Sequence, residues 1–239
     1  LSKLELSMDD HKFFIQEACN LGLTPLTTAF TKATAHEIIK LDWPKSIVKV
    51  ASYDGTCYPL IKILASKFKH LIISTGASYD SEIEETNRLL KDEFPETNIT
   101  YLHCVTKYPQ LVTDGRLLRI SWLKQFSHSI GLSDHSGREN PLALSKIGIY
   151  LGIDYLERHF TSKEYSETKD GPVSINKDEC QELVEFSKLD KETQLNNLIS
   201  TYGRKLINLT LTYNSSMSTI DEVKTRSYYR GRFASKDSK

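Results

Sequence analysis

Two histidines follow neighbouring apolar segments of the sequence, at the point where each segment ends. His135 ends Gly131-Leu-Ser-Asp-His, and His159 lies in Glu157-Arg-His-Phe-Thr161. If both segments are strands of one parallel sheet, their ends lie about 4.8 Å apart. Two imidazoles with open positions beside them suit a transition metal that acts as a Lewis acid. Spacing alone favours two unrelated polar residues at strand ends, so the metal interpretation depends on other segments.

A lysine and several hydroxyls accompany these histidines. Lys49 lies inside the apolar run 47–52, where a lysine is rarely buried without a partner. Ser52, Ser74 and Ser133 follow three such runs, and together with Lys49 they predict a cradle for a phosphate or carboxylate. Each hydroxyl alone would serve equally well as a helix cap. Asp54 lies just beyond the same run and fits either a general acid/base or the cap of the following helix.

Short apolar runs alternate with helical patterns along the chain. Strands are predicted for 23–30, 47–52, 70–75, 99–105, 129–133 and 153–160, and helices for 7–21, 33–41, 58–68, 80–94, 117–126, 141–151 and 177–189. Strict alternation of this kind predicts a parallel sheet with helices outside it. Polar residues follow nearly every strand, which favours a (β/α)₈ barrel over an open doubly wound sheet, where they would gather at one crevice. Six units are nevertheless two fewer than a closed barrel needs.

Composition excludes some classes of protein. The 239 residues contain 31 Lys+Arg against 31 Asp+Glu, and this balance argues against a dedicated nucleic-acid binder. No apolar stretch is long enough to span a membrane, and residues 1–20 do not resemble a signal peptide. The four cysteines form no CxxC pair, which favours reduced thiols in a cytoplasmic protein.

Five segments in order carry a family resemblance. These are Lys49-Val-Ala-Ser-Tyr-Asp54, Ile72-Ile-Ser-Thr-Gly76, Leu102-His-Cys-Val-Thr-Lys-Tyr-Pro109, Gly131-Leu-Ser-Asp-His135 and Leu156-Glu-Arg-His-Phe-Thr161. Together they resemble the sialic acid synthase family, over residues 4–236. The resemblance implies a (β/α)₈ barrel followed by a small antifreeze-like domain. It also implies condensation of phosphoenolpyruvate with an N-acetylated hexosamine, such as N-acetylmannosamine, to a nine-carbon 2-keto acid of the sialic or legionaminic type.

The resemblance also implies roles for individual residues. His135 and His159 are expected to bind a divalent metal, with Mn²⁺ expected first and Mg²⁺ or Co²⁺ as alternatives. Phosphoenolpyruvate contacts are expected from Lys49, Ser52, Ser74 and Ser133, and proton transfer from Asp54. Contacts on the substrate side are expected from Thr106, Tyr108 and Asp170.

The resemblance begins after the family's second strand, so the first two β/α units are expected to be missing. Residues 1–200 would then form strands three to eight of the barrel, and residues 201–239 a linker towards an absent antifreeze-like domain. Residues 208–219 are expected to be a loop and residues 225–239 a basic tail. We expect the full-length protein to be a homodimer, and the fragment to be inactive or very weak.

Two other functions remain open at this stage. A barrel remnant without catalytic activity could act as an interaction module, although a decayed site should have lost His135, His159, Lys49 or the serines. A barrel aldolase could use Lys49 as its Schiff-base lysine. His103 lies within a predicted strand and is expected to be a core histidine.

Overall fold

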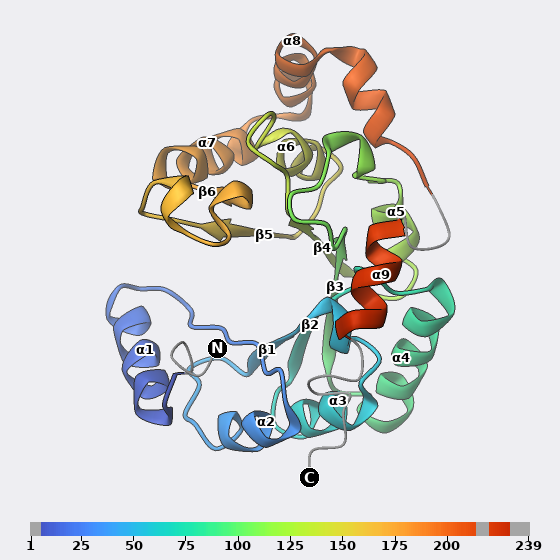
Figure 1. The fold of residues 1–239 in the computed structure, drawn as a ribbon. Helices are drawn as coiled ribbons and strands as arrows, with labels where there is room; N and C mark the ends of the chain where they lie inside the picture. Colours follow the sequence, from blue (N-terminus) through green and yellow to red (C-terminus); the bar gives the residue numbers. More distant parts are fainter. Residues whose placement is uncertain (1–5, 214–219, 230–239) are drawn as a thin grey trace.

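A parallel sheet of six strands runs through the molecule in this computed structural model, which describes residues 6–213 and 220–229 (Figure 1). The strands pair in sequence order, β1-β2-β3-β4-β5-β6. They are β1 (Ile47–Val50), β2 (His70–Ser74), β3 (Asn98–Cys104), β4 (Ser129–Asp134), β5 (Tyr155–Phe160) and β6 (Ser174–Ile175). Figure 1 shows the strands following one another along an arc, so the sheet is a curled half-barrel.

Side chains alternate between the two faces of this sheet, as the two-residue period of a strand requires. The outer face carries apolar residues such as Val48, Ile73 and Leu132, which belong to the main hydrophobic core. The inner face carries polar residues at the same strand ends, among them Lys49 and Ser74, which line a cavity. The apolar core therefore positions the polar groups from behind.

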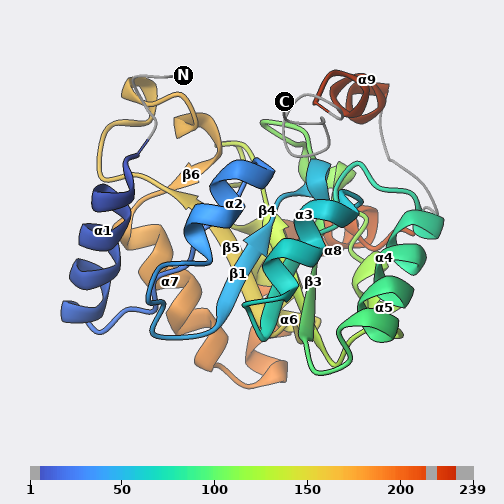
Figure 2. The same cartoon turned by 90° about the horizontal axis from the view of Figure 1, so that it is seen from below.

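The helices cover the outer face of the arc, except the last one, which lies at the end of the molecule where the strands end (Figures 1 and 2). They are α1 (Met8–Asn20), α2 (Lys32–Ile38), α3 (Tyr58–Ala65), α4 (Asp80–Glu93), α5 (Arg119–Leu123), α6 (Ala143–Tyr150), α7 (Lys177–Lys188), α8 (Lys191–Thr210) and α9 (Ile220–Tyr229). Local caps explain several of their starts: Ser7 and Asp10 form a capping box at α1, and Asn176 accepts from the Glu179 amide at α7. No helix in residues 6–213 and 220–229 is long and apolar enough to cross a membrane.

Five of the six predicted strands are confirmed, and the strand predicted for residues 23–30 is wrong. That segment makes a single parallel bridge, between Thr28 and Lys49, with the Lys49 amide donating to Thr27. Pro25 has no amide hydrogen to donate to a ladder, which works against regular pairing there. The sixth strand is instead β6, two residues that directly follow the 3₁₀ turn Gly171–Val173.

The sequential strand order excludes the doubly wound alternative, because such a sheet reverses its order at a switch point. The structure thus supports an α/β fold related to the (β/α)₈ barrel. A closed barrel is not formed by the described residues, and the two missing β/α units stay a prediction.

The C-terminal part is more helical than expected. Helix α8 continues to Thr210 through a kink at Gly203, whose φ of 75° lies in the region that glycine favours. Helix α8 thereby reaches into residues 208–210, which were expected to be a loop, and helix α9 covers residues 225–229 of the expected basic tail. The remainder of both predictions, residues 214–219 and 230–239, lies outside the described residues. The division into a barrel (1–200) and a linker (201–239) stays a prediction, and its boundary falls inside α8.

Candidate active site

A cavity of about 400 Å³ opens at the carboxyl ends of β1–β5. It is lined by Thr28, Phe30, Lys49, Ala51, Ser52, Tyr53, Ser74, Cys104, Thr106, Tyr108, Ser133, His135, Glu157, Arg158 and His159. Eight of the ten predicted site residues are among these. The two exceptions are Asp54 and Asp170. The ends of five strands thus bring together residues spread over more than one hundred positions of the sequence.

The two histidines lie side by side at this cavity. Their ring centroids are 5.4 Å apart, and Tyr108 stacks on His135 at 4.1 Å and meets His159 edge-on at 5.6 Å. His135 follows β4, and His159 lies near the end of β5, the next strand of the sheet. The prediction that neighbouring strands bring these imidazoles to one pocket is confirmed. Their role as metal ligands stays a prediction.

Hydrogen bonds set the chemical form of His135. Its Nδ1 lies 3.0 Å from the Val105 carbonyl oxygen and therefore carries the proton, while Nε2 accepts from the Tyr108 hydroxyl at 2.7 Å. Burial lowers the pKa of His135 to about 4. Burial also lowers the pKa of His159, and the nearby Asp170 opposes this shift. Both imidazoles are therefore neutral near pH 7, the form that binds metals.

The donor set tests whether a metal fits this site. Within residues 6–213 and 220–229, no group of three or more His, Cys, Asp and Glu side chains is arranged to hold a metal ion. An ion bound here would therefore have His135 and His159 as protein ligands, with its other positions open to water or substrate oxygens. This arrangement fits a Lewis acid site rather than a closed structural site. Binding at His135 Nε2 would require the Tyr108 hydroxyl to release its hydrogen bond.

A chain of polar contacts joins three strands across the cavity. Lys49 Nζ on β1 lies 3.2 Å from Glu157 Oε2 on β5, and Ser133 on β4 donates to Glu157 Oε1 at 2.6 Å. Lys49 is thus buried with a partner, as an apolar strand requires. The ammonium group, the hydroxyl and the carboxylate all face the same cavity.

Glu157 was not predicted as a site residue. A signal for it exists in the sequence, because Glu157 and His159 are two residues apart on one strand and so share its inner face. Cys104 and Tyr53 also line the cavity unpredicted. Burial raises the pKa of the Cys104 thiol to about 12, which keeps it protonated.

The serines differ in how far the protein satisfies their hydroxyls. Ser74 is 2% exposed, and its Oγ has no hydrogen-bond partner among the described residues. Within residues 6–213 and 220–229, the hydrogen bond of Ser52 Oγ is a long one of 3.5 Å to the Cys104 sulfur. A buried hydroxyl without a partner costs free energy, unless a bound ligand or water satisfies it. Both hydroxyls lie at the cavity and are therefore suited to a polar ligand.

Gly76 follows β2 and supports this part of the wall by its small size. A Cβ atom at Gly76 would lie 2.5 Å from Thr106 Cγ2, 2.9 Å from Ser52 Oγ and 3.0 Å from Cys104 Sγ. The glycine therefore lets three lining side chains approach one another.

The two acidic residues expected in the site lie at its margin. Asp54 ends the 3₁₀ turn Ser52–Asp54, is 4% exposed, and is not among the lining residues. Helix α3 begins at Tyr58 after Cys57, without a side-chain cap from that residue. Asp170 is half exposed, with Oδ2 3.7 Å from His159 Nδ1. Their expected roles stay predictions.

A buried ion pair holds the ends of β4 and β5 together behind the histidines. Arg158 Nη1 donates to Asp134 Oδ2 at 2.6 Å, and Asp134 also accepts from the Ser136 amide at 2.8 Å. Asp134 immediately precedes His135, and Arg158 immediately precedes His159. The pair therefore fixes the relative position of the two strand ends that carry the imidazoles.

His103 lies on the opposite face of β3, in the core. Its Nε2 contacts the Gly115 carbonyl oxygen at 2.6 Å, and burial lowers its pKa to about 3. The prediction of a core histidine is confirmed.

A larger cavity of about 630 Å³ lies behind β5, against α6, α7 and the start of α8. Its lining is mostly apolar. Among the described residues, Arg158 alone lines both this cavity and the one described above. None of the predicted site residues lines it.

Comparison with known proteins decides the family. A model described as the NeuB family matches residues 1–196. The chain belongs to the NeuB family. This confirms the resemblance to sialic acid synthases, since NeuB relatives include the N,N'-diacetyllegionaminic acid synthase of Campylobacter jejuni. That protein is 32% identical over 185 residues, which cover 77% of this chain and 54% of the relative.

Other relatives support the same assignment. The N-acetylneuraminate-9-phosphate synthase of Mus musculus is 27% identical, with 78% of this chain and 50% of the relative covered. The solved structure of spore coat polysaccharide biosynthesis protein SpsE from Bacillus subtilis matches with a TM-score of 0.77 and 26% identity, covering 93% of this chain and 60% of that chain. This NeuB chain spans about half the length of the curated relatives it matches.

A more distant likeness concerns the fold alone. The solved structure of a DAHP synthase from Thermotoga maritima matches with a TM-score of 0.62 and 15% identity, covering 82% of this chain and 56% of that chain. The half-barrel of this NeuB chain thus has its counterpart in barrel-type synthases.

Proposed function

We propose that this chain carries the central part of the active site of a synthase that condenses phosphoenolpyruvate with an N-acetylated hexosamine. The product would be a nine-carbon 2-keto sugar acid of the sialic or legionaminic type, with release of phosphate. N-acetylmannosamine or a related bacterial sugar is the proposed acceptor. The observation that carries the proposal is one cavity that holds two neutral imidazoles, a lysine and a buried hydroxyl that has no hydrogen-bond partner in the described part of the chain. The names of the NeuB relatives support the substrate class.

Lys49 and the serines would bind the anionic groups of phosphoenolpyruvate. The Lys49 ammonium supplies the charge, and the hydroxyls of Ser52, Ser74 and Ser133 supply donors around it. Ser133 currently donates to Glu157, so binding of an anion would redirect its proton. These groups hold the carboxylate and phosphate oxygens in place while the new bond forms at C3.

His135 and His159 would hold a divalent ion, proposed to be Mn²⁺. The ion would polarise the aldehyde of the open-chain sugar. Phosphoenolpyruvate C3 then bonds to the aldehyde carbon, water adds at C2, and the C–O bond to phosphate breaks. The Val105 carbonyl holds His135 in one tautomer, which keeps Nε2 available on the cavity side.

A carboxylate would stabilise the positive charge that develops at C2 and move protons there. Asp54 is proposed for this role on the basis of the family resemblance, although it is not among the residues that line the cavity. Glu157 lines the cavity, and we propose that it shares the role. Its contact with Lys49 supports this role, because Lys49 is proposed to bind the anion.

The parts of the protein beyond this chain are also proposed. We infer that the whole protein completes the barrel with two further β/α units, carries an antifreeze-like domain and forms a cytoplasmic homodimer. These 239 residues by themselves are then inactive or very weak. An assay of phosphate release from phosphoenolpyruvate, N-acetylmannosamine and Mn²⁺ tests this point, and robust turnover by the fragment would contradict it.

Calorimetric titration of the chain with phosphoenolpyruvate, in the presence of Mn²⁺, tests the substrate. Lys49→Met should weaken binding about 10- to 100-fold, because it removes a charge-assisted hydrogen bond worth about 1.5–3 kcal/mol. Lys62→Met is the matched control, since Lys62 pairs with Glu93 on the exposed surface. Equal affinity of the two variants, or no binding by the unmodified chain, would refute the proposal.

The aldolase alternative is tested separately. The ion pair of Lys49 with Glu157 suits an ammonium group that binds anions, whereas a Schiff base needs a neutral amine. Borohydride reduction in the presence of pyruvate should leave the mass of the chain unchanged. A stable adduct at Lys49 would replace the synthase proposal with an aldolase.

A further inference from the structure

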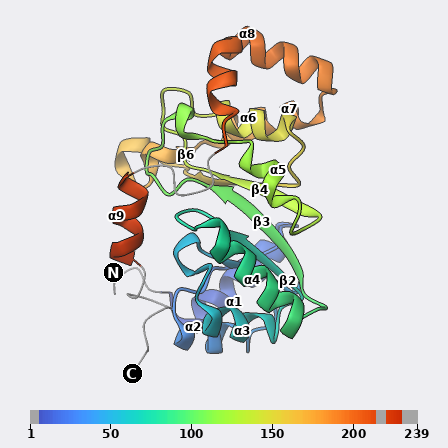
Figure 3. The same ribbon diagram turned by 90° about the vertical axis from the view of Figure 1, so that its right-hand side faces the viewer.

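Helix α9 lies at the end of the molecule where the strands end, against the loops that follow β1, β2 and β3 (Figures 2 and 3). Its contacts reach all three loops. Tyr229 stacks on Tyr53 with ring centroids 4.8 Å apart, and Arg226 donates to the Ala77 carbonyl and pairs with Glu82. Tyr53 is itself a cavity-lining residue.

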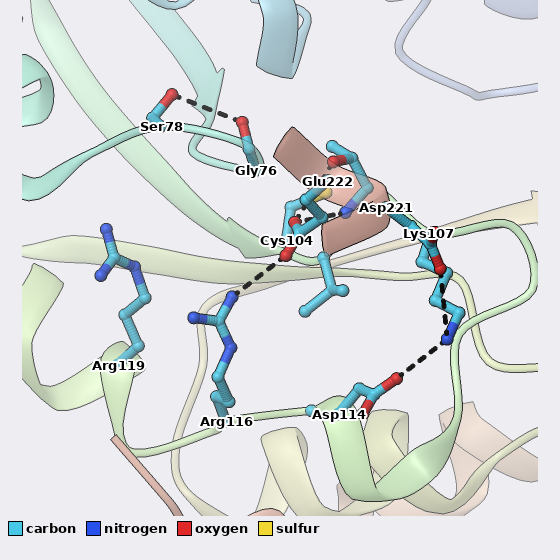
Figure 4. Close-up of polar contacts among 12 residues, drawn as sticks. Gly76, Ser78, Cys104, Lys107, Asp114, Arg116, Arg119, Asp221 and Glu222 are labelled. Carbon is cyan, nitrogen blue, oxygen red and sulfur yellow. Dashed lines mark hydrogen bonds and ion pairs between the residues drawn. The ribbon is translucent and has the colours of Figure 1, made fainter. Parts of the chain in front are cut away.

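Glu222 makes the innermost of these contacts. Its side chain is fully buried, and its Oε1 accepts from the Thr106 amide at 3.0 Å and from the Thr106 hydroxyl at 3.2 Å. Its Oε2 lies 3.5 Å from Arg116 Nη2, so the buried carboxylate has a buried cationic partner (Figure 4). A carboxylate buried in this way is stabilised by charge and hydrogen bonds together.

The contact supplies what the loop after β3 lacks. Strand β3 ends at Cys104, so the Thr106 amide no longer has a ladder partner. Glu222 provides the acceptor that a buried amide requires. Thr106 lines the cavity, and two residues later Tyr108 donates to His135 Nε2. The position of this loop therefore determines where a cavity-lining residue, Thr106, and the hydroxyl that touches a proposed metal ligand lie.

The backbone around Arg116 has an unusual conformation. The neighbouring Gly115 carbonyl contacts His103, and Arg116 adopts a φ of 45°, which few non-glycine residues do. A backbone conformation of this kind persists only when its surroundings hold it. From this backbone position the Arg116 guanidinium presents its positive charge to the Glu222 carboxylate.

We propose that Glu222 is a positioning residue for the substrate cavity: it holds Thr106, and through the same loop Tyr108, in the geometry that the site needs. The expected effect on phosphoenolpyruvate affinity rests on the proposed function, whereas the expected loosening of the loop rests on the structure alone. Helix α9 would accordingly be part of the active-site wall. Loss of the Glu222 carboxylate would loosen one loop and leave the sheet intact.

Amide hydrogen exchange of the 239-residue chain tests the conformational part. In Glu222→Ala the Thr106 amide should exchange about tenfold faster, because its hydrogen bond, worth about 1.5 kcal/mol, is lost. Glu222→Gln should restore much of the protection, since the amide oxygen still accepts. Asp221→Ala is the matched control: Asp221 is the neighbouring residue on α9, is largely exposed and reaches Lys107 only at 4.0 Å.

Binding of phosphoenolpyruvate with Mn²⁺, measured on the same variants, tests the functional part. Affinity should fall about tenfold in Glu222→Ala and less in Glu222→Gln, and stay unchanged in Asp221→Ala. Equal exchange at Thr106 in the alanine variants at positions 221 and 222 would overturn the inference. Faster exchange throughout β1–β5 would overturn it too, because Glu222 would then serve overall stability. If the unmodified chain binds no phosphoenolpyruvate, the proposed function fails, and the exchange result still decides the role of Glu222 in the loop.

Discussion

Substitution of Gly76 by alanine should damage the cavity wall directly. The added Cβ would lie 2.5 Å from Thr106 Cγ2, 2.9 Å from Ser52 Oγ and 3.0 Å from Cys104 Sγ. Cβ atoms in proteins essentially never come closer than 3.0 Å to other heavy atoms. All three neighbours are lining side chains, so relief of the overlap must reshape the cavity. Overpacking of this kind costs about 1–3 kcal/mol. For a chain of this size each kcal/mol lowers Tm by roughly 2–4 °C.

Gly55→Ala provides the matched control for this prediction. Gly55 belongs to the same β/α connection as Ser52, has an ordinary φ of −60°, and its added Cβ would meet no atom closer than 3.4 Å. Urea denaturation followed by circular dichroism should show a lower midpoint for Gly76→Ala only. Phosphoenolpyruvate binding should weaken in the same variant, because Ser52 and Thr106 are displaced. Equal midpoints and equal affinities in the two variants would show that the wall accommodates a methyl group, and the packing argument would be refuted.

Three further outcomes are expected. Asp134→Ala leaves Arg158 buried without its carboxylate partner and should lower the free energy of unfolding by about 3–5 kcal/mol in urea titrations. A loss below about 1 kcal/mol would show that the ion pair is not structurally important. The free energy of unfolding should fall as the pH drops from about 6.5 towards 3. The reason is that His103 and His135 take up protons in the unfolded state, whereas the folded state keeps them neutral. A urea midpoint that does not change with pH would contradict the lowered pKa values. Tyr108→Phe removes the hydrogen bond on His135 Nε2, so this nitrogen no longer has to lose a partner to bind an ion. Mn²⁺ affinity should rise by about 2- to 10-fold in paramagnetic titrations. Unchanged or weaker binding would argue against Nε2 as the metal-binding atom.

Much of the sheet could be predicted from the sequence, because its buried strands are short apolar runs with polar residues at their ends. Lys49 could be predicted as a site residue because a lysine inside an apolar run is rarely buried without a partner. The two-residue period of a strand, applied to β5, would have identified Glu157, two residues before His159. Local patterning was therefore sufficient wherever a residue's role depends on its own strand.

Other features depend on contacts that local patterns do not carry. The run 23–30 looks like a strand by composition, yet Pro25 and the absence of regular pairing leave a single bridge at Thr28. The two residues of β6 are too few for any periodicity. The contact of Glu222 with Thr106 joins positions 116 residues apart, and nothing near Glu222 in the sequence indicates it. Propensity and spacing describe neighbours along the chain, whereas these features are decided by neighbours in space.

The distance along the chain between Thr106 and Glu222 has a consequence for biosynthesis. A ribosome adds about 5–20 residues per second, so the 116 residues between these positions take roughly 6–23 s to make. During that interval the nascent half-barrel already contains Lys49, and later the histidines, while the amide of Thr106 still has only water as its acceptor. The contact that holds the Thr106 loop can thus form only after α9 has been synthesised, later than the strands whose ends line the cavity.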